Sequence, residues 1–339
     1  MKLSDFDYNL PDDLIAQYPA EIRGDERLLV VDRKAGSFEE RHFGDITDYF
    51  NEDDLLVLND TKVIPARLFG RRETGGKVEI FVLDRTGNLV EALVSPSFRI
   101  KQGESVILES GNRARVLGST EIGRLVEFDK PIDEILKRYG HIPLPPYISR
   151  PDEPGDEERY QTVYGNEEGA TASPTAGLHF TEDLIDKLKK KGVEVAYVTL
   201  HVSYGTFAPI REDMVERHKM HSEFYHISKE SVFNINRAHK RRAKIFACGT
   251  TSLRTLETCV GKFNAIEPEE LEGATDLFIY PGFEFKMVNT LITNFHLPKS
   301  TLLLLASAFA GKDLLFRAYN YAIEKGFRFF SYGDAMLIL

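Results

Sequence analysis

The sequence predicts an α/β fold, in which a mixed-sheet α/β main domain carries an inserted six-stranded antiparallel β-barrel. Three observations support this prediction. Short apolar segments separated by turn residues recur about every 8 to 12 residues over 66–128, as in small barrels and sandwiches. Helical and strand patterns then alternate through the C-terminal half of the chain, as in α/β domains. An apolar strand at 54–58 precedes the barrel and is expected to join the same sheet. We therefore place the main domain at 1–62 and 148–339, and the barrel at 63–147.

The barrel prediction depends on six segments rich in Val, Ile, Leu and Phe. We expect these strands at 66–72, 78–83, 89–95, 105–108, 113–117 and 123–128. The runs between them are rich in Gly, Asn, Asp, Ser and Thr, which favour the backbone angles of tight turns. A proline-rich stretch at 141–146 and an acidic stretch at 152–158 follow the last strand. They indicate the return of the chain to the main domain.

The main domain is predicted from the change to a helical period after the barrel. A helix is expected to begin near Thr181, where Glu182 and Asp183 occupy its first turn, and to end at Lys191 before Gly192. The segment 193–202 is almost continuously apolar, which favours a strand covered on both faces. The remaining helices are expected at 228–242, 252–260, 300–310 and 313–325, and the remaining strands at 244–248, 276–280, 287–293 and 327–330.

Composition excludes several classes of protein. The chain of 339 residues is 42% hydrophobic and 28% charged, which are globular values that rule out disorder and fibrous structure. Its longest apolar run, at 302–310, is interrupted by Ser307 and is shorter than the roughly 20 residues of a membrane-spanning helix. The N-terminus lacks the basic and apolar regions of a signal peptide. Cys248 and Cys259 are too few for a disulfide framework, so we expect a cytoplasmic protein.

The charges are distributed unevenly along the chain. The net charge of −10 argues against a protein that coats nucleic acid by bulk electrostatics. Residues 1–60 carry 6 Lys and Arg against 16 Asp and Glu, whereas 61–131 carries 12 against 9. A polyanion would therefore contact the barrel segment first. The candidate contacts with the phosphates of such a partner are Arg67, Arg71, Arg72, Arg113 and Arg115. On charge alone, an ordinary solvated surface explains this distribution equally well.

The sequence lacks the signatures of several other enzyme classes. It has no P-loop, no glycine-rich dinucleotide motif after a strand and no G-x-S-x-G nucleophile elbow. The histidines His218, His221 and His226 suggest a metal, and His221 with Glu223 matches half of a zinc deaminase motif. The P-C-x-x-C half is missing, and Glu223 has the wrong offset for a hydrolytic zinc helix. We therefore predict no metal site.

Loops at the predicted ends of strands and helices carry unusual residues, at positions where α/β domains place ligands. These loops are 172–180, 201–207, 249–252 and 293–299, the last taken together with 331–334. Each also has a purely structural explanation. The hydroxyls of 249–252 could cap a helix, although Arg254 in the first turn favours a bound carboxylate or phosphate. His179 or His201 alone would more often be structural, but their concurrence with His296 at separate element ends favours a site.

Long motifs extend over nearly the whole chain. In the N-terminal half they are 8–11, 14–17, 58–68, 141–148 and 160–164, and in the C-terminal half 174–181, 205–207, 220–223, 249–257, 293–301 and 332–336. Read together, these motifs resemble the S-adenosylmethionine:tRNA ribosyltransferase-isomerase family of queuosine biosynthesis. The chain departs from that family's pattern at two places. Glu26 stands where the family usually has Ser before Arg27, and Ser203-Tyr204 replaces a glycine-led pair.

The resemblance implies a particular reaction. The co-substrate would be S-adenosylmethionine, with no permanently bound cofactor, and the partner a tRNA with 7-aminomethyl-7-deazaguanine at the wobble position. The ribosyl moiety would be transferred and isomerised to give epoxyqueuosine-tRNA, releasing adenine and methionine. The resemblance implies the same α/β domain with an inserted barrel. We expect a monomer without membrane association. A non-catalytic RNA-binding protein and an S-adenosylmethionine-dependent RNA methyltransferase are the alternatives.

This reaction defines what the site must contain. Removing a proton beside the sulfonium requires a general base, and adenine leaves more easily when it is protonated. We expect the catalytic groups among His179, His201, Glu223 and Asp334. The co-substrate is expected to contact Gly249, Thr250, Thr251, Arg254, Tyr204 and Asn294, with Arg254 on its methionine carboxylate. We predict that the four catalytic candidates and Arg254 surround one cavity, with both histidines opening onto it beside the Gly249 loop.

Overall fold

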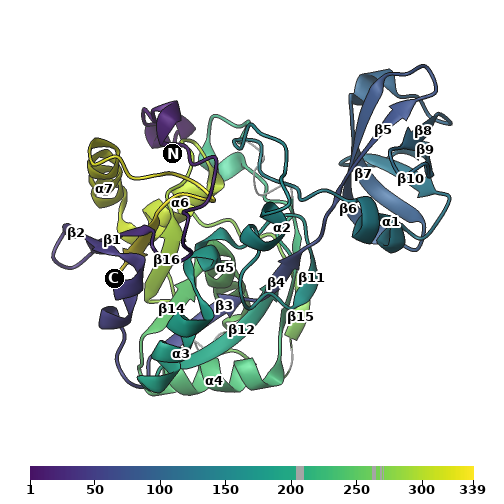
Figure 1. The fold of residues 1–339 in the computed structure, drawn as a ribbon. Helices are drawn as coiled ribbons and strands as arrows, with labels where there is room; N and C mark the ends of the chain where they lie inside the picture. Colours follow the sequence, from purple (N-terminus) through teal and green to yellow (C-terminus); the bar gives the residue numbers. More distant parts are fainter. Residues whose placement is uncertain (204–209, 262–264, 268, 270) are drawn as a thin grey trace.

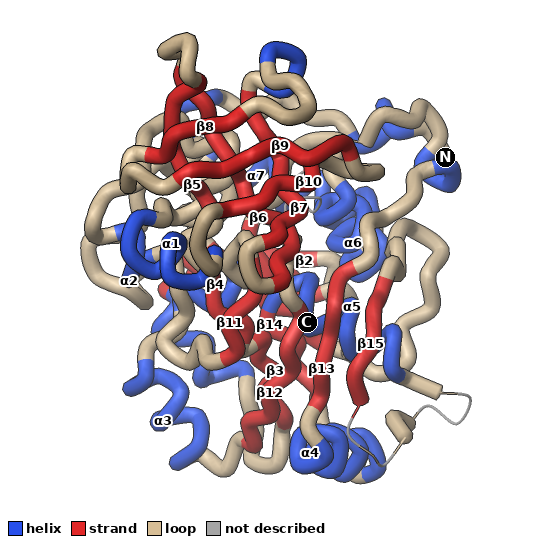
Figure 2. Tube along the Cα trace, turned by 90° about the vertical axis from the view of Figure 1, so that its right-hand side faces the viewer, coloured by secondary structure: helices blue, strands red, loops and turns tan. Residues whose placement is uncertain are grey.

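The computed structural model describes residues 1–203, 210–261, 265–267, 269 and 271–339. It confirms the predicted fold class, because a mixed sheet with helices carries a closed six-stranded antiparallel barrel. Figure 1 shows the barrel as a separate lobe beside the sheet, and Figure 2 views the molecule from the barrel side. Within the described residues, no helix is long and apolar enough to cross a membrane.

The main sheet has nine strands in the order β15-β13-β12-β3-β14-β16-β17-β1-β2. Their bounds are Arg27–Asp32 (β1), Ser37–His42 (β2), Leu55–Asn59 (β3), Glu194–Leu200 (β12), Glu223–Ile227 (β13), Ile245–Cys248 (β14), Leu271–Thr275 (β15), Thr290–Asn294 (β16) and Ala335–Ile338 (β17). The four central strands β12, β3, β14 and β16 are parallel to one another, and antiparallel strands extend the sheet on both sides. β3, which precedes the barrel in the chain, pairs with β12 and β14. These pairings confirm that this strand joins the main sheet.

Helices cover both faces of the sheet. They are α3 (Glu182–Lys190), α4 (Lys229–Lys240), α5 (Gly249–Cys259), α6 (Thr301–Ala310) and α7 (Lys312–Glu324), with short helices α1 (Ile132–Tyr139) and α2 (Asp156–Arg159) elsewhere. Alternate residues of β3 enter two different cores. Leu55 and Val57 pack with α4 to α7, whereas Leu56 and Leu58 pack with α3. The near-continuous apolar strands of the sequence are therefore buried on both faces.

The barrel closes in the strand order β10-β7-β6-β5-β8-β9. Its strands are Arg67–Arg72 (β5), Lys77–Thr86 (β6), Leu89–Ser95 (β7), Ser105–Leu108 (β8), Arg113–Ser119 (β9) and Arg124–Phe128 (β10). Helix α1 contributes Ile132, Ile135 and Leu136 to the same apolar core. A Cβ at Gly70 of β5 would lie 2.6 Å from the carbonyl oxygen of Ile107, so β5 and β8 approach closely only because this residue is glycine.

Two predicted strands are wrong. At 276–280 the backbone is bound by side chains instead, because Leu277 donates its N–H to Thr275 Oγ1 and its carbonyl accepts from Arg254 Nε. At 327–330 Phe329 makes one bridge to Ile15, and Phe330 has a φ of +71°, which ends the extended backbone. The strands in these regions are β15 and β17. The prediction also omitted β1, β2, β13 and the short strand β11 (Glu167–Ala170), which pairs with β4 (Thr61–Val63).

The chain enters and leaves the barrel at one place. Arg67 and His141 exchange two backbone hydrogen bonds, with N···O distances of 3.3 and 2.8 Å. The ring of His141 also packs edge-on against Phe69 of β5, and its Nδ1 lies 3.0 Å from Asp152. The segment that enters the barrel and the segment that leaves it are thus hydrogen-bonded to each other.

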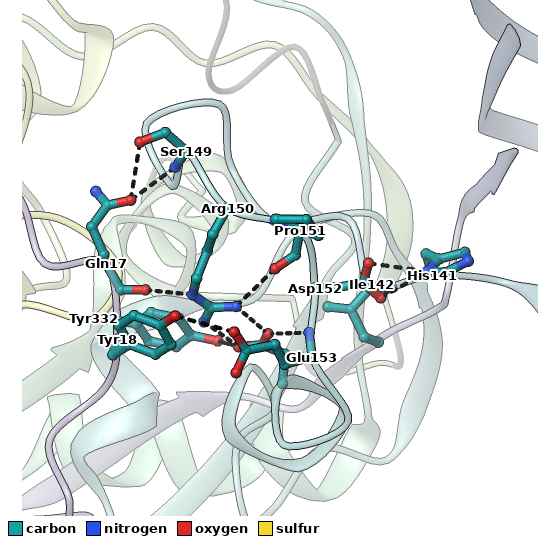
Figure 3. Close-up of polar contacts among 11 residues, drawn as sticks. Gln17, Tyr18, His141, Ile142, Ser149, Arg150, Pro151, Asp152, Glu153 and Tyr332 are labelled. Carbon is teal, nitrogen blue, oxygen red and sulfur yellow. Dashed lines mark hydrogen bonds and ion pairs between the residues drawn. The ribbon is translucent and has the colours of Figure 1, made fainter. Parts of the chain in front are cut away.

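A buried ion pair anchors the segment that returns from the barrel (Figure 3). The guanidinium of Arg150 binds both oxygens of Asp156, at 2.7 and 2.8 Å, and its Nε donates to the carbonyl of Gln17. Tyr332 donates its hydroxyl to the same carboxylate at 2.8 Å. Burial raises the pKa of Asp156, but the bonds from Arg150 and its neighbours outweigh burial and leave the pKa below its usual value. These contacts join the N-terminal loop, the returning segment and the C-terminal region.

Candidate functional site

The predicted site loops meet at one edge of the sheet. Because β3, β12, β14 and β16 are parallel, their carboxyl ends at Asn59, Leu200, Cys248 and Asn294 lie along the same edge. The 201–207, 249–252 and 293–299 loops follow three of these strands directly. Ligands of open α/β sheets bind at this edge. The structure therefore brings three of the predicted loops to one edge of the sheet.

Two neighbouring cavities open at this edge. The narrow pocket, of about 40 Å³, is lined by Ser173, Pro174, Thr175, Ala176, Val202, Gly249, Thr250, Thr251, Thr293, Asn294, His296 and Leu302. The wide cavity, of about 300 Å³, is lined by Tyr147, Thr175, Ile210, Asn294, Phe295, His296, Leu297, Pro298, Lys299, Ser300, Leu302, Phe330 and Ser331. The two cavities share Thr175, Asn294, His296 and Leu302, so these residues lie between them.

Helix α5 begins at the narrow pocket. Gly249 has a φ of +87°, which turns the chain sharply from β14 into the helix. Helix α5 therefore starts three residues earlier than predicted, and Gly249, Thr250 and Thr251 form its first turn beside the pocket. The first N–H groups of a helix have no intrahelical partner, and with the helix dipole they favour an anion. This turn can hold a carboxylate without any cationic side chain.

The narrow pocket contains buried polar atoms that make no hydrogen bond within the described part of the chain. These are Ser173 Oγ, Thr251 Oγ1 and Asn294 Oδ1. Buried polar groups in native proteins nearly always have partners, and an unpaired one costs roughly 1 to 3 kcal/mol. Three such atoms around one small space indicate a ligand rich in hydrogen-bonding groups.

His296 belongs to both cavities, although the predicted site omitted it. Its Nε2 lies 2.8 Å from Thr293 Oγ1, and its backbone is fixed by the hydroxyls of Tyr319 and Tyr8. Burial lowers its pKa to about 3, so the ring is neutral near pH 7. The signal was present in the sequence, because His296 lies in one of the four singled-out loops. The hydroxyls of Ser173 and Thr175 in the 172–180 loop offered a similar signal.

Arg254 and Glu223 form a buried ion pair with each other, and neither lines the narrow pocket or the wide cavity. Glu223 also accepts the N–H of Ser203 at 3.0 Å, and Arg254 Nε donates to Leu277. The expectation that Arg254 binds the methionine carboxylate directly stays a prediction, since Nη1 holds Glu223 while Nη2 makes no hydrogen bond within the described residues. The pair also fixes the chain directly after Val202, which lines the narrow pocket.

The two predicted catalytic histidines do not open onto one cavity. His179, in the 3-10 helix Thr175–His179, is buried; its Nε2 lies 3.2 Å from Asn294 Nδ2 and its Nδ1 3.6 Å from Glu26. His201 lies on the barrel side, where its Nδ1 is 2.7 Å from Thr61 Oγ1 and its ring stacks on Phe224. Burial lowers the pKa of His201. The predicted five-residue cluster is thus wrong as a single cavity wall.

Asp334 also binds groups within the protein. Its carboxylate accepts the N–H groups of Arg27 and Arg328, at 3.1 and 2.7 Å, and so ties the start of β1 to the turn before β17. Asp334 lines neither of the two cavities, and its expected catalytic role stays a prediction. Tyr204 lies outside the described residues. Within those residues, no group of three His, Cys, Asp or Glu could hold a metal ion, and the prediction of no metal stays a prediction.

The five barrel arginines fall into two groups. Arg67 and Arg72 are paired with acidic side chains, since Arg67 lies 2.9 Å from Glu79 and Arg72 contacts Glu104 twice, at 2.5 and 3.2 Å. Arg71, Arg113 and Arg115 are exposed.

The strand register aligns part of the exposed group. Arg71 of β5 pairs with Lys77 on one side and Ile107 on the other, and Ile107 pairs with Arg113. We call the residues Lys77, Arg71, Ile107 and Arg113 the cationic row. It crosses four neighbouring strands of the barrel.

The fold and the site define an α/β protein with an inserted barrel and a polar ligand cavity at the carboxyl edge of its sheet. The family described as queuosine biosynthesis protein matches residues 3–338. The S-adenosylmethionine:tRNA ribosyltransferase-isomerases of Caldanaerobacter subterraneus subsp. tengcongensis and of Sulfurihydrogenibium sp. are each 50% identical, with the full length of both chains aligned. The crystal structure of the S-adenosylmethionine tRNA ribosyltransferase from Thermotoga maritima is 41% identical, with a TM-score of 0.57 over 99% of this chain and 100% of that one. The chain belongs to this family of queuosine biosynthesis enzymes.

Proposed function

We propose that the chain transfers and isomerises the ribosyl moiety of S-adenosylmethionine onto 7-aminomethyl-7-deazaguanine in tRNA. The products are epoxyqueuosine-tRNA, adenine and methionine, with the modified base at the wobble position. The observation that carries this proposal is the family match over almost the full chain, together with a polar cavity where such a co-substrate would bind. S-adenosylmethionine is a co-substrate here, because it is consumed in the reaction. A monomer in the cytoplasm is part of the same proposal.

The co-substrate is proposed to span the two cavities. Its methionine carboxylate is placed at the first turn of α5, where unpaired N–H groups and the helix dipole favour an anion. Its hydroxyl and amino groups are placed against Ser173, Thr251 and Asn294, whose buried oxygens have no hydrogen-bond partner among the described residues. The wide cavity, of about 300 Å³, is at the lower end of the size of small-molecule sites.

His201 is proposed to take a proton on the RNA side of the site. A primary aminomethyl group is largely protonated near neutral pH, and it must lose a proton before it attacks the sugar. His201 is neutral because burial lowers its pKa, and it lies between β4 and β13 on the side of the sheet that faces the barrel. His296 suits a different role, because a pKa of about 3 makes it a hydrogen-bonding group rather than a base.

The tRNA is proposed to lie across the outer face of the barrel. The cationic row and Arg115 give that face exposed positive charges that the described acidic side chains do not pair. Phosphate contacts of this kind position an RNA without reading its sequence. Arg67 and Arg72 are left out of this surface because Glu79 and Glu104 hold them.

Release of free adenine tests the proposed reaction. The protein is mixed with S-adenosylmethionine and tRNA that carries 7-aminomethyl-7-deazaguanine, and adenine is quantified by chromatography. We expect adenine and ribosylated tRNA in equal amounts, and neither product with tRNA that carries guanine. A non-catalytic RNA-binding protein would release nothing. A methyltransferase would release S-adenosylhomocysteine and no adenine, and either result would refute the proposal.

A further inference from the structure

Asn294 stands where the site meets a chain of buried polar groups. It ends β16, is 3% exposed, and lines both cavities. Its Nδ2 lies 3.0 Å from the carbonyl oxygen of Phe330 and 3.2 Å from His179 Nε2. Its Oδ1 makes no hydrogen bond to any described residue. Both polar contacts of this side chain are therefore made by its nitrogen, and its carbonyl oxygen has no partner among the described residues.

The carbonyl of Phe330 determines how the Asn294 amide is turned. A carbonyl oxygen accepts hydrogen bonds but cannot donate them, so the group that faces it must be the NH₂ of Asn294. That NH₂ has two hydrogens, and its second neighbour is His179 Nε2. The Oδ1 atom is then the end of the amide that is buried without a partner among the described residues. An amide turned the other way would place two oxygens against each other.

The orientation of the Asn294 amide also determines the tautomer of His179. If Asn294 donates to Nε2, then Nε2 carries no hydrogen and the ring proton is on Nδ1. Nδ1 lies 3.6 Å from the carboxylate of Glu26, which is slightly longer than a hydrogen bond but close enough for a strong charge–dipole contact. Glu26 is itself held by the N–H of Gly24 at 2.8 Å. The ring of His179 packs against the ring of Phe43, and the two ring centroids are 5.0 Å apart.

We propose that His179 and Glu26 are positioning residues that hold Asn294 Oδ1 toward the cavity, where it accepts a hydrogen bond from an N–H or O–H group of S-adenosylmethionine. This inference rests on the proposed function for the identity of the ligand. It reverses the direct catalytic role predicted for His179, because the ring acts through Asn294. The ligand donor is either a group of the nucleoside half or the ammonium of the methionine half, and the two are distinguished below.

Substitutions at His179 separate positioning from proton transfer. His179→Gln keeps an acceptor near the position of Nε2, whereas His179→Leu removes it and frees the Asn294 amide. Adenine release is measured at saturating tRNA with varied S-adenosylmethionine. We expect His179→Leu to raise the KM for S-adenosylmethionine about tenfold with kcat changed less than about threefold, the size expected for one buried hydrogen bond. His179→Gln should stay within about threefold of wild type in both constants.

A general base and a positioning residue at His179 predict different pH profiles. A general base at His179 would lose roughly 10² to 10⁴ in kcat in both variants, together with the acidic limb of the rate profile. A positioning residue leaves that limb in place. Loss of the limb in His179→Gln, or an unchanged KM in His179→Leu, would overturn the inference. His239→Leu is the matched control, because His239 lies at the end of α4 by the opposite edge of the sheet.

Two further variants keep the test independent of how His179→Leu folds. Asn294→Ala removes the acceptor itself and should raise the same KM by about tenfold or more. Glu26→Gln keeps the size of the side chain but removes the charge that favours the Nδ1–H tautomer, and it should raise the KM about threefold. Unchanged KM values in both variants, with folding confirmed by circular dichroism, would also overturn the inference.

Inhibition by 5′-methylthioadenosine locates the donor. This probe contains the nucleoside half of the co-substrate without its amino acid. If the donor is a ribose hydroxyl or the adenine amino group, Asn294→Ala weakens inhibition about as much as it raises the KM. If the donor is the ammonium, inhibition is unchanged while the KM still rises. Should wild type release no adenine, the proposed function fails, and direct calorimetric binding of the probe and of S-adenosylmethionine then tests the Asn294 contact alone.

Discussion

The buried ion pair of Arg254 and Glu223 connects single side chains with the shape of the site. Both side chains are almost fully buried, and each also binds a backbone group, Leu277 O for Arg254 and Ser203 N for Glu223. A charge this deep is tolerated only when it is paired. The pair therefore determines the course of the chain that follows Val202 at the narrow pocket. Its influence on a bound co-substrate is exerted through that chain.

Removing one member of this pair should destabilise the protein strongly. Arg254→Ala leaves the Glu223 carboxylate buried without its cation, and the free energy of unfolding should fall by about 3 to 5 kcal/mol. The double variant Glu223→Gln with Arg254→Met removes both charges and should recover most of that loss. Urea unfolding followed by circular dichroism gives both numbers. Equal losses in the single and double variants would contradict the role assigned to the pair.

His296 should make stability depend on pH. Its pKa is about 3 in the folded protein and near 6.5 when unfolded, so the unfolded state binds a proton first as the pH falls. This depressed pKa contributes stability above pH 6.5 that is lost progressively toward pH 3. Between pH 7 and pH 5 wild type should lose about 2 kcal/mol more than His296→Gln. Urea unfolding at both pH values measures the difference, with His239→Gln as the control, and parallel losses would refute it.

Residue types in the loops indicated the site, but not which side chains reach the cavity. The hydroxyls and the positive-φ glycine of 249–252 were recognisable because a strand followed by such a turn is a common ligand-binding pattern. Arg254, Glu223 and Asp334 attracted attention through their charge. In the fold, each of these charges has protein partners, although Arg254 Nη2 has none among the described residues, and a linear sequence does not show which partners will be near. Asn294 was included without the contacts to Phe330 and His179 that determine its orientation.

At the level of elements, three helices begin directly after a hydroxyl residue that caps them. Thr181, Ser228 and Ser300 each accept an N–H of the first turn of α3, α4 and α6. The six barrel strands also lie where alternating apolar residues and turn formers predict them. Local signals failed where tertiary contacts decide the structure. The apolar segment at 327–330 is buried among aromatic rings without forming a strand, and the polar outer strand β2 carries no apolar signal.

The first turn of α5 should be sensitive to its glycine. Gly249 has a φ of +87°, and a Cβ there would meet Thr251 Oγ1 at 3.4 Å and Ala176 Cβ at 3.7 Å, which is ordinary contact. Gly249→Ala therefore costs about 1 to 2 kcal/mol through its backbone alone. A backbone that relaxes from positive φ also moves the N–H groups that face the narrow pocket, so we expect a raised KM for S-adenosylmethionine.

Gly326 provides a control for this effect. It also has a positive φ, of +66°, and its Cβ would meet nothing within 4 Å. Gly326→Ala at the end of α7 should lower the free energy of unfolding by a similar amount without changing the KM. Thermal unfolding and steady-state adenine release measure the two effects. A KM that changes equally in both variants would show that the Gly249 turn has no special relation to the pocket.

At the level of the whole molecule, the acidic charge of the first 60 residues and the exposed arginines of the barrel belong to different parts of the chain. The barrel stands as its own lobe (Figure 1), and the cationic row crosses four of its strands. The net charge of −10 therefore does not prevent RNA binding, because the charges that matter are local. The fold class and the insertion followed from the sequence. The alignment of Arg71 with Arg113 did not, because it depends on the register of three strands.

Neutralising the cationic row should weaken tRNA binding. The double variant Arg71→Ala with Arg113→Ala removes two candidate phosphate contacts, so the slope of log affinity against log salt should fall by about 2. The KM for S-adenosylmethionine should stay the same. Lys190→Ala with Lys240→Ala removes the same charge at the ends of α3 and α4, and it serves as the control. Filter binding of tRNA at several salt concentrations measures the slope, and an unchanged slope would make these arginines ordinary surface residues.

The paired backbones of Arg67 and His141 have a consequence for how such a protein can arise. Because the inserted lobe begins and ends at hydrogen-bonded neighbours, a short turn could close the same gap without rethreading the sheet. An ancestral chain could thus acquire the lobe in a single recombination event and keep its existing core. The same geometry lets one inserted lobe be exchanged for another while the core of the parent domain is preserved. The lobe and the parent domain can then be inherited as separable parts.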